Sequence, residues 1–331
     1  MLYVIFNCKM LHRIYRRIRF GLLMLLAILI VACTNTSRVA VNADCYTVQH
    51  IAGETCVPRQ PQRVVALDSF TLEYLLALGI QPIGAVFDQF ASQLQQDLKG
   101  ITNIGSTGEP NLESIVSLQP DLIVGMDYYQ TIYSQSSQIA PTILYEFEHS
   151  GKWKEVFLDF AQILQKGEAA QQVMSNYHSR LDQFKQQMGK RLQNTEVSVV
   201  RIYPNQINLY LKDSFSGTIL QDAGLPRPPA QAIAADDAQK RFGNPIQTSI
   251  SRELLPQADG DVMFVWTGEN TSEANQQAQQ KLTQLKSDPL WRKMKVVQQN
   301  KIYQVPSYWI GSGPIAANLV LDDLFKYLAN N

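Results

Sequence analysis

Short β-branched runs alternate with stretches of helical spacing in the first half of this chain. The apolar runs predict strands at 63–67, 83–86, 121–125 and 143–147, and the stretches between them predict helices at 71–78 and 112–118. Strands that alternate with helices pack into a mostly parallel sheet whose faces the helices cover. This pattern predicts an α/β fold.

A long stretch with few breakers, 152–192, follows this alternation. Five of its apolar residues recur at helical steps of three and four: Val173, Tyr177, Leu181, Phe184 and Met188. We therefore expect a connecting helix at 167–194, between an N-terminal α/β lobe at 44–166 and a C-terminal α/β lobe at 195–331. In the second lobe the alternation returns, with strands at 197–202, 207–211, 261–266 and 302–305 and helices at 216–222 and 316–328.

One segment of the first lobe recurs in the second. Residues 111–124 align without a gap on 251–264, so that each position of the second copy is numbered 140 higher. In both copies a small polar residue that can cap a helix stands two positions before a Glu, and an Asp eight positions after that Glu opens an apolar strand. The repeat predicts two lobes of related design, with Glu113 and Glu253 in equivalent places.

Both glutamates are expected to be exposed near the start of a helix. Capping and the helix dipole favour a Glu there by less than ~1 kcal/mol, so that a purely local role is sufficient. A pair of equivalent carboxylates also forms a two-pronged acidic surface, whose complement is a partner with two matching basic spots.

The first 32 residues read as a signal peptide. Five basic residues precede an apolar run of 13 residues from Phe20 to Ala32, which is short for a membrane-spanning helix, and Cys33 follows directly. The end of this run resembles the lipobox of bacterial lipoproteins, in which the Cys becomes lipidated. That resemblance implies a lipidated tether at 33–43, whereas a plain secretory signal is the alternative. Both Met1 and Met10 are candidate start codons.

The charge balance changes once this segment is set aside. The chain has 29 basic and 29 acidic residues, and removal of the five basic residues near the N-terminus leaves 24 against 29, a net charge of about minus five. A protein of this negative net charge is not expected to bind nucleic acid. Export also favours a disulfide between Cys45 and Cys56, which flank a predicted short hairpin, over two free thiols.

Several segments together resemble the helical-backbone substrate-binding proteins of ABC importers for iron(III)-siderophores and cobalamin. The matching segments are RVVALDSFTLEYLLALGIQPIG, IGSTGEPNLESIVSLQPDLIVG, ISRELLPQADGDVMFVW, DPLWRKMKVVQQNKIYQV and GPIAANLVLDDLFKYL, together with the long helix. The resemblance implies two Rossmann-like lobes with mostly parallel sheets, joined rigidly by one long helix, and a ligand held in the cleft between them. It covers nearly all of the chain after Arg63.

The resemblance also implies partners and a location. In that family the glutamates matching Glu113 and Glu253 form salt bridges with arginines of the two permease subunits, which work with an ATPase. We accordingly expect a monomer in the periplasm or at the cell surface, anchored to the membrane through lipidated Cys33, that captures an iron(III)-siderophore. The siderophore can be of the citrate type or of mixed type, and cobalamin or haem is the alternative ligand. No cofactor is expected.

Ligand-binding residues are expected in the loops after the strands, because open parallel sheets bind ligands there. That rule and the resemblance select nine side chains: Ser69, Phe70, Thr107, Tyr128, Tyr129, Arg201, Tyr203, Trp266 and Trp309. Their aromatic rings can cover the apolar arms of a chelate, and a guanidinium can donate to its oxygens.

Each candidate also has a structural alternative: Tyr128 and Tyr129 can begin a helix, Trp266 can belong to the core, and Arg201 can pair with a carboxylate. Hydroxamate-binding members of the family carry an Arg where this chain has Thr107, which argues against a hydroxamate ligand.

Other functional classes find less support. The histidines after residue 43 are spread over different elements, so no metal is expected to be held directly by the protein; ferric iron bound by the tyrosines at 128, 129 and 133 is a minor alternative. Elements of catalysis are missing as well: the chain has no G-x-S-x-G elbow, no phosphate-binding loop and no dinucleotide fingerprint after a strand. The sequence therefore indicates a binding protein rather than an enzyme.

Overall fold

The computed structural model describes residues 44–330 except 88–92, 95 and 269–270. The predicted signal peptide at 1–32, the tether at 33–43 and the lipidation site Cys33 lie outside the described residues. Within the described ranges, no helix is both long and apolar enough to cross a membrane. Contacts between Cα atoms divide the chain at position 45, and Tyr46–Asn331 forms one compact unit.

The first half contains a five-stranded sheet in the order β5-β4-β3-β8-β9, and every pair of neighbouring strands in it is parallel. Its strands are β3 (Val64–Ala66), β4 (Gly84–Ala85), β5 (Thr102–Asn103), β8 (Leu122–Met126) and β9 (Thr142–Tyr145). The helical segments of this half are α2 (Ser69–Ala77), α3 (Leu112–Leu118), η2 (Asp127–Ile132), α4 (Tyr133–Ile139), η3 (Ser150–Lys152) and α5 (Trp153–Ile163). The α/β alternation predicted for this half is confirmed.

Two small hairpins accompany this sheet. One consists of β1 (Cys45–His50) and β2 (Gly53–Pro58), and the other of β6 (Gly105–Ser106) and β7 (Glu109–Pro110). Cys45 and Cys56 are both disulfide-bonded.

The second half contains a mixed sheet in the order β12-β11-β10-β13-β14. The strands β10 (Val197–Ile202), β13 (Val262–Trp266) and β14 (Ile302–Gln304) run parallel, whereas β11 (Ile207–Tyr210) and β12 (Gln247–Ile250) are antiparallel to their neighbours. Only four residues separate β10 from β11, and the backbone N–H of Tyr203 donates to the carbonyl of Gln206 across that turn. So short a connection permits an antiparallel hairpin and excludes a parallel crossover.

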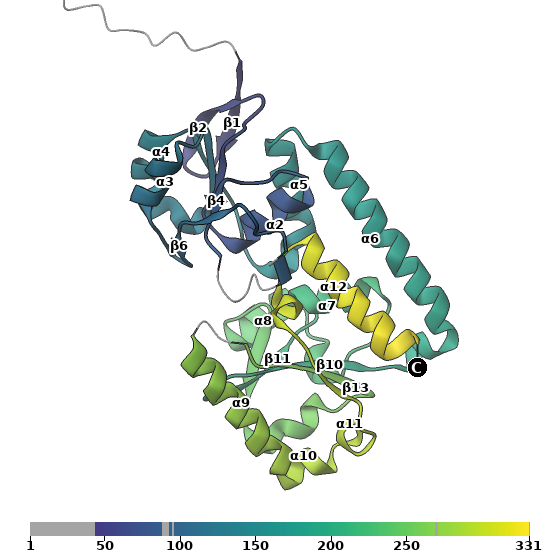
Figure 1. The fold of residues 1–331 in the computed structure, drawn as a ribbon. Coiled ribbons are helices and arrows are strands. Elements are labelled where there is room, and N and C mark those ends of the chain that lie inside the picture. The colour runs from purple at the N-terminus through teal and green to yellow at the C-terminus, as the bar shows by residue number, and fades with distance from the viewer. Residues whose placement is uncertain (1–43, 88–92, 95, 269–270, 331) are drawn as a thin grey trace, which may run out of the picture. The chain divides into compact units, whose positions relative to one another are not determined.

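Helices cover both faces of this second sheet. They are α7 (Phe215–Asp222), α8 (Ala235–Phe242), α9 (Ser272–Ser287), α10 (Pro289–Lys293), α11 (Lys295–Gln298) and α12 (Pro314–Leu324). Shorter helical turns are η5 (Pro229–Gln231), η6 (Arg252–Ala258), η7 (Ser307–Ile310) and η8 (Phe325–Ala329). On one side of the sheet lie α9, α10 and α11 (Figure 1), and their apolar residues share a core with β10 and β13.

The long helix α6 (Gly167–Met188) connects the two halves and is followed by η4 (Gly189–Asn194). Its buried stripe consists of Ala170, Met174, Tyr177, Leu181, Phe184 and Met188, so that the predicted stripe is displaced only at its first turn. Helix α12 runs alongside α6 (Figure 1), and the guanidinium of Arg180 donates to the Asn318 side chain at 2.8 Å and pairs with Asp322.

A single hydrophobic core extends through both halves. The β3 residues Val64 and Ala66 face this core, as do the β10 residues Val197 and Val199, together with the buried sides of α2, α5, α6, α7 and α12. The opposite face of each sheet has a smaller core of its own. Because a period of two sends alternate strand residues to opposite faces, each sheet contributes one face to the shared core.

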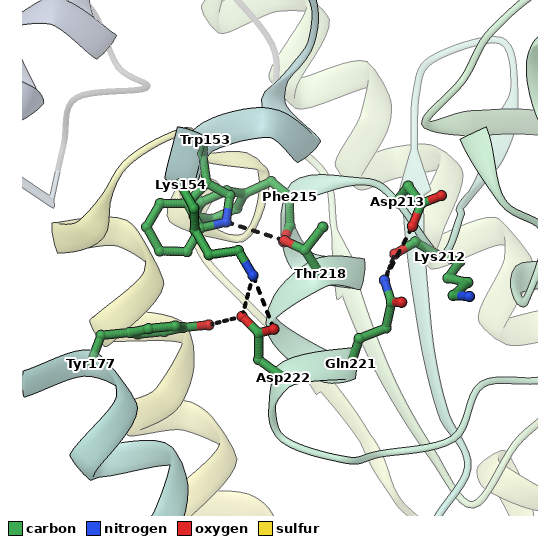
Figure 2. Close-up of polar contacts among 9 residues, drawn as sticks. All are labelled: Trp153, Lys154, Tyr177, Lys212, Asp213, Phe215, Thr218, Gln221 and Asp222. Atoms are coloured by element: carbon green, nitrogen blue, oxygen red, sulfur yellow. Dashed lines mark hydrogen bonds and ion pairs between the residues drawn. The ribbon is translucent and has the colours of Figure 1, made fainter. Parts of the chain in front are cut away.

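A polar cluster reinforces this connection between α5, α6 and α7 (Figure 2). Asp222 accepts hydrogen bonds from Lys154 Nζ at 2.7 Å and from the hydroxyl of Tyr177 at 2.9 Å, and Trp153 Nε1 donates to Thr218 Oγ1 at 3.1 Å. Burial, and then the neighbouring carboxylate of Asp222, raise the pKa of Tyr177. One helix of the first half, the connecting helix and one helix of the second half are thereby tied together.

The two copies of the internal repeat occupy matching positions. Helix α3 and turn η6 differ by the predicted 140 positions, as do β8 and β13. Asp121 accepts from the backbone N–H of Arg63 at 2.9 Å, and Asp261 accepts from that of Glu196 at 2.8 Å. In each copy the Asp therefore joins its own strand to the neighbouring one.

The helical parts of the copies differ. In the first copy the Asn111 side chain caps α3 by accepting from Ser114 N at 2.9 Å. In the second copy Ser251 makes no such cap bond, and Pro256 lies inside η6. Because proline lacks an N–H and collides with the preceding turn, the second copy forms a 3₁₀ segment instead of an α-helix.

Candidate ligand-binding site

A cavity of about 600 Å³ opens at the carboxyl ends of β3 and β8. That volume lies within the range of small-molecule binding sites. Most lining residues belong to the segments that follow the strands of the first half, including the starts of α2 and η2, and three belong to the segment after β14. They are Asp68, Ser69, Phe70, Glu73, Gln93, Thr107, Met126, Asp127, Tyr128, Tyr129, Phe147, Ser307, Ile310 and Gly311.

Asp68 organises the edge of the cavity directly after β3. Its carboxylate accepts from the backbone N–H of Thr71 at 2.7 Å, from the hydroxyl of Thr71 at 2.7 Å and from the backbone N–H of Met126 at 3.2 Å. Burial raises the pKa of Asp68, although these donors oppose the effect by stabilising the carboxylate. The residue therefore caps α2 and fixes that helix against the end of β8.

Glu73 is the second buried carboxyl group at the cavity and is only 2% exposed. Its Oε1 accepts from the backbone N–H of Ala316 at 2.9 Å, in the first turn of α12. Next to it, the hydroxyl of Tyr74 donates to the carbonyl of Ser312 at 2.7 Å. Burial raises the pKa of Glu73 to about 7. This cavity wall thus joins α2 of the first half to α12 of the second.

Aromatic rings form much of the remaining wall. Phe70 and Phe147 stack with their centroids 5.4 Å apart, and Tyr128 meets Tyr129 edge to face at 5.5 Å. Tyr128 is 69% exposed, whereas Tyr129 is buried and its hydroxyl accepts from Gly108 N at 3.4 Å. Both tyrosines lie in η2 and also line the cavity, so that a helical position is compatible with the predicted ligand-binding role.

Three of the predicted ligand residues form a separate group at the end of the second sheet. The guanidinium of Arg201 lies 4.0 Å from the ring centroid of Tyr203 and 3.8 Å from that of Trp266. It also donates to the carbonyl of Gly268 at 2.8 Å and to the hydroxyl of Tyr210 at 3.4 Å. Burial raises the pKa of Tyr203, an effect that the nearby Arg201 charge partly opposes.

This group does not line the cavity, and the ligand-binding role of Arg201, Tyr203 and Trp266 stays a prediction. Trp266 is buried in the shared core, as its structural alternative proposed. Arg201 is engaged within the second half, because it donates to the Gly268 carbonyl and to the Tyr210 hydroxyl.

Trp309 also lies outside the cavity. Its side chain is 0% exposed, stacks on Phe264 at 4.2 Å and donates from Nε1 to Asp323 at 2.8 Å. The ring therefore fills the shared core, because the backbone of η7 turns it inward. Its neighbours Ser307 and Ile310 line the cavity instead.

The repeat glutamates lie on the surface, away from the cavity. Glu113 and Glu253 are both exposed, and exposed apolar side chains accompany them, Val116 on α3 and Leu254 next to Glu253. The backbone N–H of Glu253 and the side chain of Ser251 lower the pKa of Glu253, so that it remains ionised. The adjacent Arg252 pairs with Asp288.

Direct metal binding finds no support in the described residues, where no group of three or more His, Cys, Asp or Glu could hold an ion. Tyr133 does not join the two cavity tyrosines either. Its hydroxyl lies 3.5 Å from Thr55 Oγ1, and its ring contacts that of His50.

Sequence reasoning missed several lining residues, of which Glu73 and Phe147 are the most informative. Glu73 is the only charged residue of the otherwise apolar segment TLEYLLALG, a signal that could have singled it out. Phe147 follows β9 and obeys the strand-end rule that selected the other candidates.

Comparison with known proteins identifies the class. A family model described as periplasmic binding protein matches residues 64–309, and this chain belongs to that family. Its members are binding proteins of transport systems, so that the chain is a binding protein and not an enzyme. The predicted resemblance to substrate-binding proteins is thereby confirmed.

Two individual relatives and one solved structure are similar to this chain along most of its length. The probable siderophore-binding lipoprotein YfiY of Bacillus subtilis is 34% identical over 92% of this chain and 95% of that protein. The achromobactin-binding periplasmic protein of Dickeya dadantii is 27% identical over 80% of this chain and 86% of that protein. The structure of Staphylococcus aureus SirA complexed with staphyloferrin B is 24% identical, with a TM-score of 0.72 over 86% of this chain and 98% of that one. That likeness confirms the fold.

Proposed function

We propose that this protein captures an iron(III)-siderophore outside the cytoplasm and delivers it to an ABC permease. The observation that carries the proposal is the cavity at the carboxyl ends of β3 and β8, walled by Phe70, Tyr128, Tyr129 and Phe147. Aromatic walls with a few polar groups suit a bulky metal chelate. YfiY and the achromobactin-binding protein, similar along most of their length, are both named for siderophores.

The cavity is suited to a chelate and not to a bare ion. Two of its three carboxyl groups are engaged by the protein itself: Asp68 by three donors and Glu73 by the first turn of α12. Iron would therefore arrive with its own ligands and need none from the protein. Cobalamin and haem, the alternative ligands, do not occur in the names of the relatives described above.

The repeat glutamates form the proposed docking surface for the permease. Each half presents an exposed carboxylate next to an exposed apolar side chain. These are Glu113 with Val116, and Glu253 with Leu254. Exposed ion pairs of this kind contribute orientation and association rate more than affinity. The lipid anchor at Cys33, which would hold the protein at the membrane surface near its permease, is part of the same proposal.

Ligand capture is tested by titrating the protein without its signal peptide with ferric chelates and following intrinsic fluorescence. A ferric siderophore should quench at submicromolar concentration, and the iron-free chelator should be much weaker. Tyr128→Ala should weaken binding by about tenfold, because it removes one aromatic wall. Tyr46→Phe, at a tyrosine outside the cavity, is the matched control. Quenching by cobalamin or haemin but by no ferric chelate would refute the ligand assignment.

The docking surface needs a separate experiment. The double variant Glu113→Ala with Glu253→Ala should bind ligand like the parent protein but should lose transport in cells or in proteoliposomes that carry the permease. Asp236→Ala with Asp237→Ala, on α8, removes two exposed charges elsewhere and serves as control. Reduced ligand affinity in the glutamate double variant would contradict the docking role.

A further inference from the structure

The charges around the cavity are all of one sign. Asp68, Glu73 and Asp127 line it, and among the lining residues that the structure describes there is no Lys, Arg or His. The sequence supplies no basic residue at 88–92, 95 or 269–270 either. Fixed charges in a concave, partly desolvated site act on a ligand more strongly than they would in water.

The three carboxyl groups differ in their surroundings. Asp68 is buried and accepts three hydrogen bonds from the protein. Glu73 accepts from Ala316 N, and burial raises its pKa to about 7. Asp127 is partly exposed at the start of η2. Carboxylate oxygens accept hydrogen bonds, and Glu73 carries its negative charge mainly above a pH of about 7. The cavity therefore offers carboxyl groups to a chelate and, among the described lining residues, no cationic donor to its oxygens.

Arg201 is the one cation that the sequence placed among the ligand residues, and the structure holds it elsewhere. Its guanidinium stacks between the rings of Tyr203 and Trp266 and donates to the Gly268 carbonyl. Arg201 therefore does not line the cavity, whereas three carboxyl groups do. Thr107 lines the cavity with a neutral hydroxyl and adds no charge.

We propose that this cleft selects ferric chelates of low net charge, uncharged or singly charged, and excludes multiply anionic ones such as ferric tricatecholates and ferric citrate. The inference rests on the proposed function and specifies its ligand class. Apolar arms of the chelate lie against Phe70, Phe147 and Ile310, and its amide or ammonium N–H groups donate to the carboxylates. A triply negative chelate gains the same apolar contacts but meets repulsion that no lining cation offsets.

The experiment is a titration with four defined chelates at low and high salt. They are an uncharged ferric trihydroxamate, a singly negative ferric complex of a citrate-based dihydroxamate, a triply negative ferric tricatecholate, and ferric citrate. The two hydroxamates are chosen for the low charge of their ferric complexes, against the sequence-based expectation from Thr107. One of the first two should bind at least about tenfold more tightly than either of the others, and the difference should shrink as salt screens the repulsion. A tricatecholate or ferric citrate that binds as tightly as the best low-charge chelate would overturn the inference, while siderophore capture would stand. Failure of all four chelates would instead refute the proposed function.

A variant that lacks one carboxylate of the cavity tests whether repulsion causes the selectivity. Asp127→Asn should raise the affinity for the tricatecholate relative to that for the trihydroxamate by about threefold or more, because it removes one repulsive charge from the cavity. Asp237→Asn, an exposed carboxylate on α8, should leave this ratio as it is. An unchanged ratio in Asp127→Asn, with thermal unfolding like that of the parent protein, would show that the cavity charges do not set the selectivity.

Discussion

Replacing the buried carboxyl group of Glu73 by an amide should change how the stability of the protein depends on pH. Glu73 is almost fully buried, and its Oε1 accepts from Ala316 N at 2.9 Å. In the variant Glu73→Gln the amide oxygen can accept the same hydrogen bond, but the side chain carries no charge at any pH. The substitution therefore removes the titration with little change in shape.

The magnitude follows from the two pKa values. In the unfolded chain Glu73 titrates near its ordinary pKa of 4.5, whereas burial raises the pKa in the native protein to about 7. Between these values the native state keeps a proton that the unfolded state has lost, so that the free energy of unfolding falls as pH rises through this window. The fall is complete above the native pKa and amounts to about 3 kcal/mol, since one pH unit corresponds to about 1.4 kcal/mol.

Urea unfolding followed by tryptophan fluorescence, from a pH of about 4 to about 8, measures this effect. Relative to the parent protein, Glu73→Gln should gain about 3 kcal/mol in its free energy of unfolding between the two ends of that range. Glu155→Gln, at an exposed position on α5, is the control and should stay parallel to the parent protein. If Glu73→Gln also stays parallel, the native pKa of Glu73 is not raised, and the reasoning from its burial is refuted.

Other substitutions probe the core and the connection between the halves. Trp309→Phe should lower the free energy of unfolding by about 1–3 kcal/mol, because it removes the hydrogen bond to Asp323 and part of the ring contact with Phe264. Ligand affinity should not change, and a loss of affinity without a loss of stability would show that Trp309 contacts the ligand. Tyr177→Phe should cost about 1 kcal/mol by removing the hydroxyl that donates to Asp222. A double-mutant cycle with Lys154→Met should show coupling through that carboxylate, and additive unfolding energies would exclude it. Asp261→Ala should destabilise by about 1–3 kcal/mol, because the backbone N–H of Glu196 loses its acceptor, and an unchanged midpoint in urea would contradict that role.

The local pattern of apolar and capping residues predicted most of the secondary structure. It also indicated candidate residues at the carboxyl ends of the strands. Strand 197–202 and helix 112–118 were predicted with the bounds that the structure has, because apolar periodicity and capping residues act within a few positions. Of the residues that the strand-end rule selects, Ser69, Phe70 and Tyr128 line the cavity. The rule describes where parallel strands end, which depends on the backbone alone.

The rule does not specify which way a side chain turns, and neither Trp309 nor Arg201 lines the cavity. Trp309 faces inward, since Phe264 and Asp323 complete its surroundings from other elements. Arg201 is held by Trp266 and by the Gly268 carbonyl of the neighbouring strand and loop. These contacts exist only once the sheet is assembled.

The sequence by itself determined the α/β alternation, the connecting helix and the 140-residue repeat that makes Glu113 and Glu253 equivalent. Only the tertiary structure decided which aromatic residues line the cavity and that carboxyl groups dominate its charge. Glu73 shows the reason: its partner Ala316 is 243 positions away in the chain. Periodicity and capping are local properties, whereas burial, pKa and the charge of a cavity arise between segments that meet only in the folded protein.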